Sequence, residues 1–390
     1  MRCSATSVQT VRRPDAPRLR GMTTLRGRLV TPTYDGPAEV SVENDRVTAV
    51  SELEAGPVED VLLPGLVDVH CHGGGGAAFT SGSAEEARAA AAHHLQHGTT
   101  TLLGSLVTDT PEQMLRGVEI LADLVEEGLL AGIHLEGPFL SAERCGAQDP
   151  RHLLDPDPAL AARLVEAGRG HVRVMTVAAE LPGAVDVAAQ LGAAGVVVAL
   201  GHTASTFAVA RAFLGAPETG LVTHLFNGMP ALHHRDPGPV GAALAAARAG
   251  EVVVELIADG VHLADDTVTT AFALLGPDAV ALVTDAMAAA GMADGHYRLG
   301  PQDVVVEAGV ATLARNGAIA GGTARLSDVV ARLVALGLPA SDVVRAATRS
   351  PARAAGLDAP LVRVGDRADI VVADPDLRPR RVMRSGRWVA

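Results

Sequence analysis

The chain has 390 residues, a formal net charge of −13 at pH 7 and a sequence pI of about 5.5. This acidic balance, with no stretch that concentrates arginine, argues against nucleic acid as a partner. No apolar run approaches the length of a membrane-spanning helix, so we expect no membrane association. Cys3, Cys71 and Cys145 are too few and too scattered for a disulfide framework, which favours a cytoplasmic location.

Lysine is absent, because all 32 basic residues are arginine. Chemistry that needs a lysine amine is therefore excluded: a Schiff base, a Walker-type phosphate loop and a metal pair bridged by a carboxylated lysine. A chain of 390 residues also exceeds the size at which one hydrophobic core stops growing. We expect one large domain with a smaller companion.

The two ends of the chain have a similar β-like pattern. Residues 1–21 lack the apolar segment of a secretory signal, so we expect a disordered tail, or a true start at Met22. Residues 22–65 and 356–390 contain short strand-like runs separated by turn residues. We predict that these two segments form one small β-sandwich domain.

Residues 66–355 alternate apolar strand-like runs with alanine- and leucine-rich stretches of helical period, which is typical of a parallel α/β sheet. The predicted strands are Val67–His70, Thr101–Leu106, Ala131–Glu136, Val172–Val177, Val196–His202, Leu221–His224, Val252–Ile257 and Val280–Asp285. The predicted helices include Ala84–Gln96, Pro111–Glu127, Ala184–Ala194, Val240–Ala249 and, after a hairpin at Val304–Leu313, Leu326–Leu336 and Ala340–Ala355. Eight such units close a (β/α)8 barrel of the TIM type.

Imidazoles and carboxylates stand at the C-terminal ends of five of the predicted strands. They are His70, His72, Glu136, His202, His224 and Asp285. One buried histidine alone is more often a core residue than a ligand, but packing gives no reason for the whole pattern. Because the βα loops of a TIM barrel converge on this face, we expect these side chains to surround one cavity.

The His-x-His pair suggests a metal site. His70 and His72 lie on the same side of an extended segment, because side chains alternate with period two. Imidazole and carboxylate ligands favour zinc or another divalent first-row metal. Such an ion lowers the pKa of bound water and supplies hydroxide as nucleophile, and Asp285 is the expected proton acceptor and donor.

Several motifs resemble those of a known superfamily. Leu63-Pro-Gly-Leu-Val-Asp-Val-His-Cys-His-Gly73 is similar to the entry motif of the amidohydrolases, and Ile133-His-Leu-Glu-Gly-Pro-Phe139 is similar to that of their N-acetylglucosamine-6-phosphate deacetylases. Five further motifs follow in family order: Leu200-Gly-His-Thr203, Thr223-His-Leu-Phe-Asn-Gly-Met-Pro230, Ala258-Asp-Gly-Val-His262, Val283-Thr-Asp-Ala286 and Ile319-Ala-Gly-Gly-Thr323. The resemblance covers nearly all of the chain after residue 22.

The resemblance implies a role for each matching residue. Glu136, His202 and His224 would hold the main metal, with Asp285 as catalytic acid and base. The intact His-x-His pair implies a second ion bridged by Glu136, so one or two ions per subunit are expected, Zn²⁺ before Fe²⁺, Co²⁺ or Mn²⁺. The implied substrate-binding residues are Ala147, Asn227, Gly228, Arg235, His262, Ile319, Ala320 and Gly321.

The implied reaction converts N-acetylglucosamine-6-phosphate to glucosamine-6-phosphate and acetate, in amino-sugar catabolism and cell-wall recycling. The partners implied are the phosphosugar and a second copy of the chain, in a homodimer where Asn and Arg of one subunit can serve the neighbour. Gln148 is the nearest counterpart of a histidine that single-metal relatives place near the acetyl carbonyl, so polarisation of that carbonyl would fall to the second ion.

Two other functions stay open at this stage. One is an amidohydrolase that acts on a cyclic amide or nucleobase, and the other is a catalytically silent scaffold. Among the remaining histidines, His134 is expected to support the ligands, whereas His93, His94 and His97 are expected at the surface or end of a helix. Cys145 either overhangs the site or is a buried apolar thiol.

Overall fold

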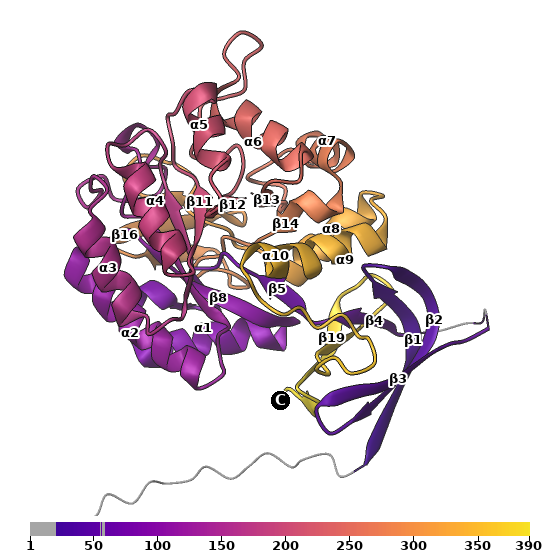
Figure 1. Ribbon diagram of the computed structural model, residues 1–390. Coiled ribbons are helices and arrows are strands. Elements are labelled where there is room, and N and C mark those ends of the chain that lie inside the picture. Colours follow the sequence, from indigo (N-terminus) through magenta and orange to yellow (C-terminus); the bar gives the residue numbers. More distant parts are fainter. Residues whose placement is uncertain (1–20, 55, 57–58) are drawn as a thin grey trace, which may run out of the picture.

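The computed structural model describes residues 21–54, 56 and 59–390. Within them, a large barrel is wrapped by helices, and a separate sheet beside it combines the indigo N-terminal and yellow C-terminal strands (Figure 1). The predicted tail, residues 1–21, lies outside the described residues apart from Gly21. No helix in the described part of the chain combines the length and apolar character needed to cross a membrane.

The barrel contains eight parallel strands in sequential order, which confirms the predicted fold class. They are β5 (Leu66–Asp68), β8 (Thr99–Val107), β9 (Gly132–Glu136), β10 (Val172–Val177), β11 (Val197–Leu200), β12 (Thr219–Val222), β13 (Val253–Leu256) and β14 (Val280–Leu282). Inward-facing apolar side chains such as Val67, Leu103 and Val174 fill the interior.

The first and last strands are joined by a buried carboxylate. Asp68 Oδ2 accepts a 2.6 Å hydrogen bond from the Thr284 hydroxyl, and Asp68 Oδ1 accepts one of 3.2 Å from the His70 amide. Beyond the strands, the Asp285 amide donates to the His70 carbonyl at 2.9 Å. These contacts close the barrel and bring the residues that follow β5 next to those that follow β14.

Helices surround the barrel and pack alanine- and leucine-rich faces against it. They are α1 (Ala84–Gln96), α2 (Pro111–Glu126), α3 (Pro158–Ala167), α4 (Ala184–Ala193), α5 (Phe207–Leu214), α6 (Gly238–Arg248), α7 (Asp265–Leu275), α8 (Leu326–Ala335), α9 (Ala340–Ala346) and α10 (Arg349–Ala354). Single 3₁₀ turns occur at Phe79–Ser81, Ala142–Arg144 and Pro277–Ala279. Capping side chains such as Thr110, which accepts from the Gln113 amide, mark the helix starts.

The predicted helix Ala340–Ala355 is wrong, because the structure divides it into α9 and α10 at Ala347 and Thr348. Pro351 has no amide hydrogen to donate to the Ala347 carbonyl. That carbonyl instead accepts from the Val67 amide at 2.9 Å. The break therefore ties the end of the barrel domain to β5.

Two smaller sheets lie outside the barrel. β6 (Gly73–Gly74) pairs with β7 (Ala77–Ala78), directly after the His-x-His segment. The predicted hairpin is present as β16 (Gln302–Glu307) and β17 (Val310–Leu313), and it gains a third, unpredicted strand, β15 (Gly295–Leu299). The segment Gly295–Leu299 escaped prediction because polar residues interrupt its apolar ones.

The end domain is one seven-stranded sheet assembled from both ends of the chain, as predicted. Its order is β20 (Arg387–Trp388), β19 (Pro379–Arg384), β18 (Ile370–Ala373), β4 (Val61–Pro64), β1 (Met22–Thr31), β2 (Tyr34–Glu43) and β3 (Arg46–Glu52). The halves share one core in which Leu29 and Val40 pack with Ile370 and Met383. The domain boundaries at residues 65 and 355 stay a prediction.

Candidate active site

Six polar residues follow the C-terminal ends of barrel strands and converge on one point. His70 and His72 follow β5, Glu136 ends β9, His202 follows β11, His224 follows β12 and Asp285 follows β14. His202, His224 and Asp285 have positive φ angles of 45°, 28° and 46°. Such conformations are uncommon outside glycine, and they cluster where the surrounding structure holds a functional side chain in place.

The first group of potential ligands joins Glu136 to His202 and His224. Glu136 Oε1 lies 3.0 Å from His202 Nε2 and 2.9 Å from His224 Nε2. The two imidazole Nε2 atoms are 3.1 Å apart. All three side chains are buried, and their ligand atoms lie within 4.8 Å of one another. This spacing matches what three ligands of a single cation require.

The second group joins the same carboxylate to the His-x-His pair. Glu136 Oε2 lies 3.1 Å from His72 Nε2, and Glu136 Oε1 lies 3.7 Å from His70 Nε2. The Nε2 atoms of His70 and His72 are 3.1 Å apart. Glu136 therefore faces both groups at once, as a carboxylate between two cations must.

Asp285 lies against the second group rather than the first. Asp285 Oδ1 is 3.3 Å from His70 Nε2 and 3.2 Å from His72 Nε2. The side chain keeps 13% of its surface exposed, whereas Glu136 keeps only 4%. Asp285 is thus the carboxylate of the cluster that has the most access to a molecule in the cavity.

Hydrogen bonds on the far side of the ring orient two of the imidazoles, those of His202 and His72. His202 Nδ1 donates to the Arg144 carbonyl at 2.8 Å, and His72 Nδ1 donates to the Ser105 carbonyl at 3.2 Å. With Nδ1 protonated, Nε2 presents its lone pair to the centre of the cluster. The donor chemistry therefore fits a divalent metal at each group.

Burial has the largest single effect on the pKa values of His72 and Asp285, but their polar partners together outweigh it. Burial lowers the pKa of His72, but hydrogen bonds to Asp285 and Glu136 outweigh it and raise the pKa to about 9. Burial raises the pKa of Asp285, but His70 and His72 outweigh it and lower the pKa to about 2. The metal-free cluster thus pairs ionised carboxylates with imidazoles that readily hold protons, and a bound cation would displace those protons.

A cavity of about 240 Å³ opens above the cluster, and six of the predicted substrate-binding residues line it. They are Ala147, Asn227, Gly228, His262, Ile319 and Gly321. His262 Nδ1 is 2.8 Å from Asp259 Oδ2. Gly228 has φ +62°, and a Cβ there would lie 2.9 Å from His202 Nδ1, so glycine suits this position.

Two predicted substrate-binding residues do not line this cavity. Ala320 is fully buried, and its amide donates to the Ala311 carbonyl at 3.0 Å, so it holds the loop between Ile319 and Gly321. Arg235 is exposed on the segment between β12 and α6, which projects away from the helices at the top of the view in Figure 1. That these two residues bind substrate therefore stays a prediction, which the cavity of one chain does not account for.

Sequence reasoning missed one residue and placed another only loosely. Glu255 of β13 is fully buried, and its carboxylate is 3.0 Å from His70 Nδ1. The only signal for it was a charge within an otherwise apolar strand. Gln148 Nε2 donates to Glu136 Oε2 at 2.7 Å, so this amide holds the shared carboxylate. His134, as expected, supports the site: its ring contacts His70 at 4.5 Å between centroids.

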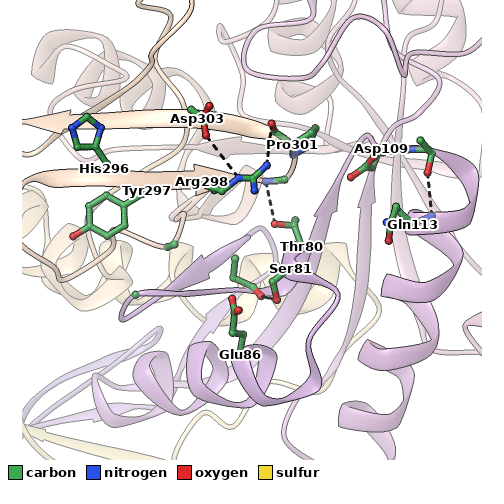
Figure 2. Close-up of a pocket in the computed structure, with 15 residues that line it drawn as sticks. Thr80, Ser81, Glu86, Asp109, Gln113, His296, Tyr297, Arg298, Pro301 and Asp303 are labelled. Carbon is green, nitrogen blue, oxygen red and sulfur yellow. Dashed lines mark hydrogen bonds and ion pairs between the residues drawn. The ribbon is translucent and has the colours of Figure 1, made fainter.

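A larger hollow of about 940 Å³ lies between β15, β16 and the start of α2 (Figure 2). Arg298 and Asp303, two charged residues that line it, are exposed and pair at 3.9 Å. None of the potential metal ligands described above lines it. The smaller cavity is the better candidate active site because the buried ionisable groups converge there.

A parallel barrel with imidazoles and carboxylates gathered at its C-terminal face defines a class of metal-dependent hydrolases. The chain belongs to the amidohydrolase family, whose model matches residues 61–389.

Several similar proteins act on phosphorylated acetamido sugars. The N-acetylglucosamine-6-phosphate deacetylase of Mycobacterium smegmatis, solved as an aspartate-to-alanine variant with N-acetyl-D-glucosamine-6-phosphate, is 44% identical with a TM-score of 0.90, and the match covers 95% of this chain and 99% of that one. The Lysinibacillus sphaericus deacetylase of the same name is 30% identical over 90% of this chain and 91% of its own. An Escherichia coli O157:H7 N-acetylgalactosamine-6-phosphate deacetylase is 32% identical over 84% and 87%.

Proposed function

We propose that this chain hydrolyses N-acetylglucosamine-6-phosphate to glucosamine-6-phosphate and acetate. The observation that carries the proposal is the position of Asp285 and two groups of potential metal ligands at the base of a cavity of about 240 Å³. Relatives that are 30% and 44% identical carry the same activity in their names. The barrel, the donor set and the family all suit cleavage of a linear amide.

The donor set suits one or two divalent ions. Glu136, His202 and His224 would hold one, and His70 and His72 with Glu136 would hold the other. When bound, such an ion lowers the pKa of a coordinated water and polarises an amide carbonyl. Zinc is the ion we expect, because three or four imidazole and carboxylate ligands match its usual coordination.

The chain's own residues would manage the proton and the sugar. Asp285, ionised at neutral pH, accepts a proton from water as it attacks the acetyl carbonyl, and returns it to the glucosamine nitrogen as the C–N bond breaks. His262, oriented by Asp259, and Asn227 would bind the sugar phosphate. Water is consumed, and acetate and the free amine leave.

The phosphate needs a cation, and among the described residues that line the cavity there is no arginine. Arg235 is exposed on a projecting segment, and its guanidinium has no partner among the described residues. We therefore propose a homodimer in which Arg235 of each subunit reaches the other's cavity and binds the phosphate. We also propose that the enzyme acts in the cytoplasm, in amino-sugar catabolism and cell-wall recycling.

One competing substrate is favoured by a specific similarity. The 32% identity to an N-acetylgalactosamine-6-phosphate deacetylase makes the C4 epimer the main alternative. A cyclic amide or nucleobase is the second alternative, since other barrels of this family act on different C–N bonds.

Acetate release from a substrate panel tests the proposal. The zinc-loaded chain is assayed for acetate release with N-acetylglucosamine-6-phosphate, its galacto epimer and N-acetylglucosamine. Hydantoin represents the cyclic amides, and its hydrolysis is measured as ring opening. N-acetylglucosamine-6-phosphate should give the highest kcat/KM. A higher kcat/KM for the galacto epimer or for hydantoin would replace the proposal with the corresponding alternative.

A further inference from the structure

Glu255 occupies an unusual place for a charged residue. It lies inside β13, and its side chain points into the barrel interior together with those of Val253 and Ile257. It is fully buried, and no basic side chain other than an imidazole pairs with it among the described residues. A buried carboxylate without compensating contacts is costly, so its contacts should explain why it is there.

A single oxygen of Glu255 accepts from two different strand ends. Glu255 Oε2 lies 3.0 Å from His70 Nδ1 and accepts a 3.0 Å hydrogen bond from the His224 amide. His70 follows β5, and His224 follows β12, the neighbour of β13. The two donors belong to different ligand groups, so one oxygen connects both.

Each contact has a consequence for ligation. When its Nδ1–H donates the hydrogen bond to Glu255, His70 keeps a free lone pair on Nε2, the atom that faces His72 and Glu136. His224 adopts an uncommon φ of 28°, and the hydrogen bond from its amide to Glu255 helps to hold the backbone in this conformation. Both the ring of His70 and the backbone that aims His224 thus depend on the same carboxylate.

We propose that Glu255 is a positioning residue that orients His70 and His224 together and thereby couples the two candidate metal sites. The proposal rests on the proposed metal-dependent function. Glu255 does not touch the cavity and is not itself a ligand. Carboxylates that orient metal-bound histidines affect metal affinity by about 10- to 100-fold.

Two substitutions separate the hydrogen bond from the charge. Glu255→Gln can keep an acceptor near both donors and removes only the charge, whereas Glu255→Met has similar length and removes the acceptor. We expect zinc affinity, measured by competition with a chromophoric chelator, to fall about 10-fold in Glu255→Gln and about 100-fold in Glu255→Met. If Glu255→Met does not fold, Glu255→Gln carries the test.

A second readout distinguishes positioning from a purely structural role. Saturating zinc should raise the Tm of the wild type, and a positioning defect reduces this zinc-dependent increase, whereas a general loss of stability lowers both Tm values equally. Asp369→Asn is the matched control, because Asp369 is a fully buried carboxylate in the end domain that accepts from the Ser385 amide at 2.7 Å. It should lower Tm without changing zinc affinity.

The outcomes separate the two proposals. Wild-type zinc affinity and wild-type Tm increase in both Glu255 variants would overturn the positioning role and leave the deacetylase function intact. A wild-type chain that binds no zinc at all would instead overturn the metal-dependent function on which this inference rests.

Discussion

Glu136 Oε1 lies 2.9 Å from Nε2 of His224. The other oxygen of the same carboxylate, Oε2, lies 3.1 Å from Nε2 of His72. Because one side chain serves both ligand groups, we predict that Glu136→Ala loses both bound ions. His72→Asn should lose only one, since Glu136, His202 and His224 remain. Metal content per chain after dialysis, measured by elemental mass spectrometry, checks this; equal losses in the two variants would contradict a shared carboxylate.

The role of Asp285 predicts a loss of turnover without a loss of fold. In Asp285→Asn, the amide cannot accept the proton of the attacking water, so kcat should fall by about 10²- to 10⁴-fold. Circular dichroism and zinc content at saturating zinc should match the wild type. Unchanged kcat in a folded, zinc-loaded variant would remove Asp285 from the mechanism.

Arg235 predicts a selective defect in substrate recognition. Removal of a charge-assisted hydrogen bond to phosphate costs about 1.5–3 kcal/mol, so kcat/KM for the phosphorylated sugar should fall about 10- to 100-fold in Arg235→Ala. Any turnover of N-acetylglucosamine should be unaffected. Arg248→Ala, a change at an exposed arginine of α6, is the matched control. Equal losses on both sugars would point to a structural effect instead.

Much of this site follows from the sequence because barrel topology converts separate strand ends into neighbours. His202 and His224 lie 22 positions apart, yet parallel strands bring their Nε2 atoms to 3.1 Å. The pattern of polar residues at strand ends was therefore enough to predict the cluster. Periodicity also located all eight barrel strands.

Other features depend on contacts that no local pattern records. His94 lies in the last turn of α1, which agrees with the expected helix end, but it is fully buried. The segment 73–76 covers it, and His94 Nε2 donates to the Gly73 carbonyl at 2.8 Å. The partners of Glu255 lie on two other strands, so their identity requires the closed barrel. The position of Arg235 likewise depends on how far its segment projects.

The burial of His94 predicts a pH dependence of stability. Burial, as the largest cause, lowers the pKa of His94 from 6.5 to about 4. Between these values the unfolded chain binds a proton that the folded chain does not, so the free energy of unfolding should fall as pH falls from 6.5 toward 4. The contribution of His94 is at most about 3 kcal/mol.

Urea unfolding of the metal-free chain at pH 7 and pH 5 measures this effect. His94→Gln, which can still donate to the Gly73 carbonyl, should lose less stability between the two pH values than the wild type does. His171→Gln is the control, because that ring is partly exposed. An identical pH dependence in His94→Gln and the wild type would show that His94 titrates normally.

Reconstitution of the metal-free protein tests the metal-dependent mechanism most directly. The chain is stripped with a chelator, and acetate release from N-acetylglucosamine-6-phosphate is followed as zinc is added back in measured amounts. We expect no turnover without metal. The rate should rise with added zinc and level off when both ligand groups that share Glu136 hold an ion. Full acetate release by protein that elemental analysis shows to be metal-free would contradict the account.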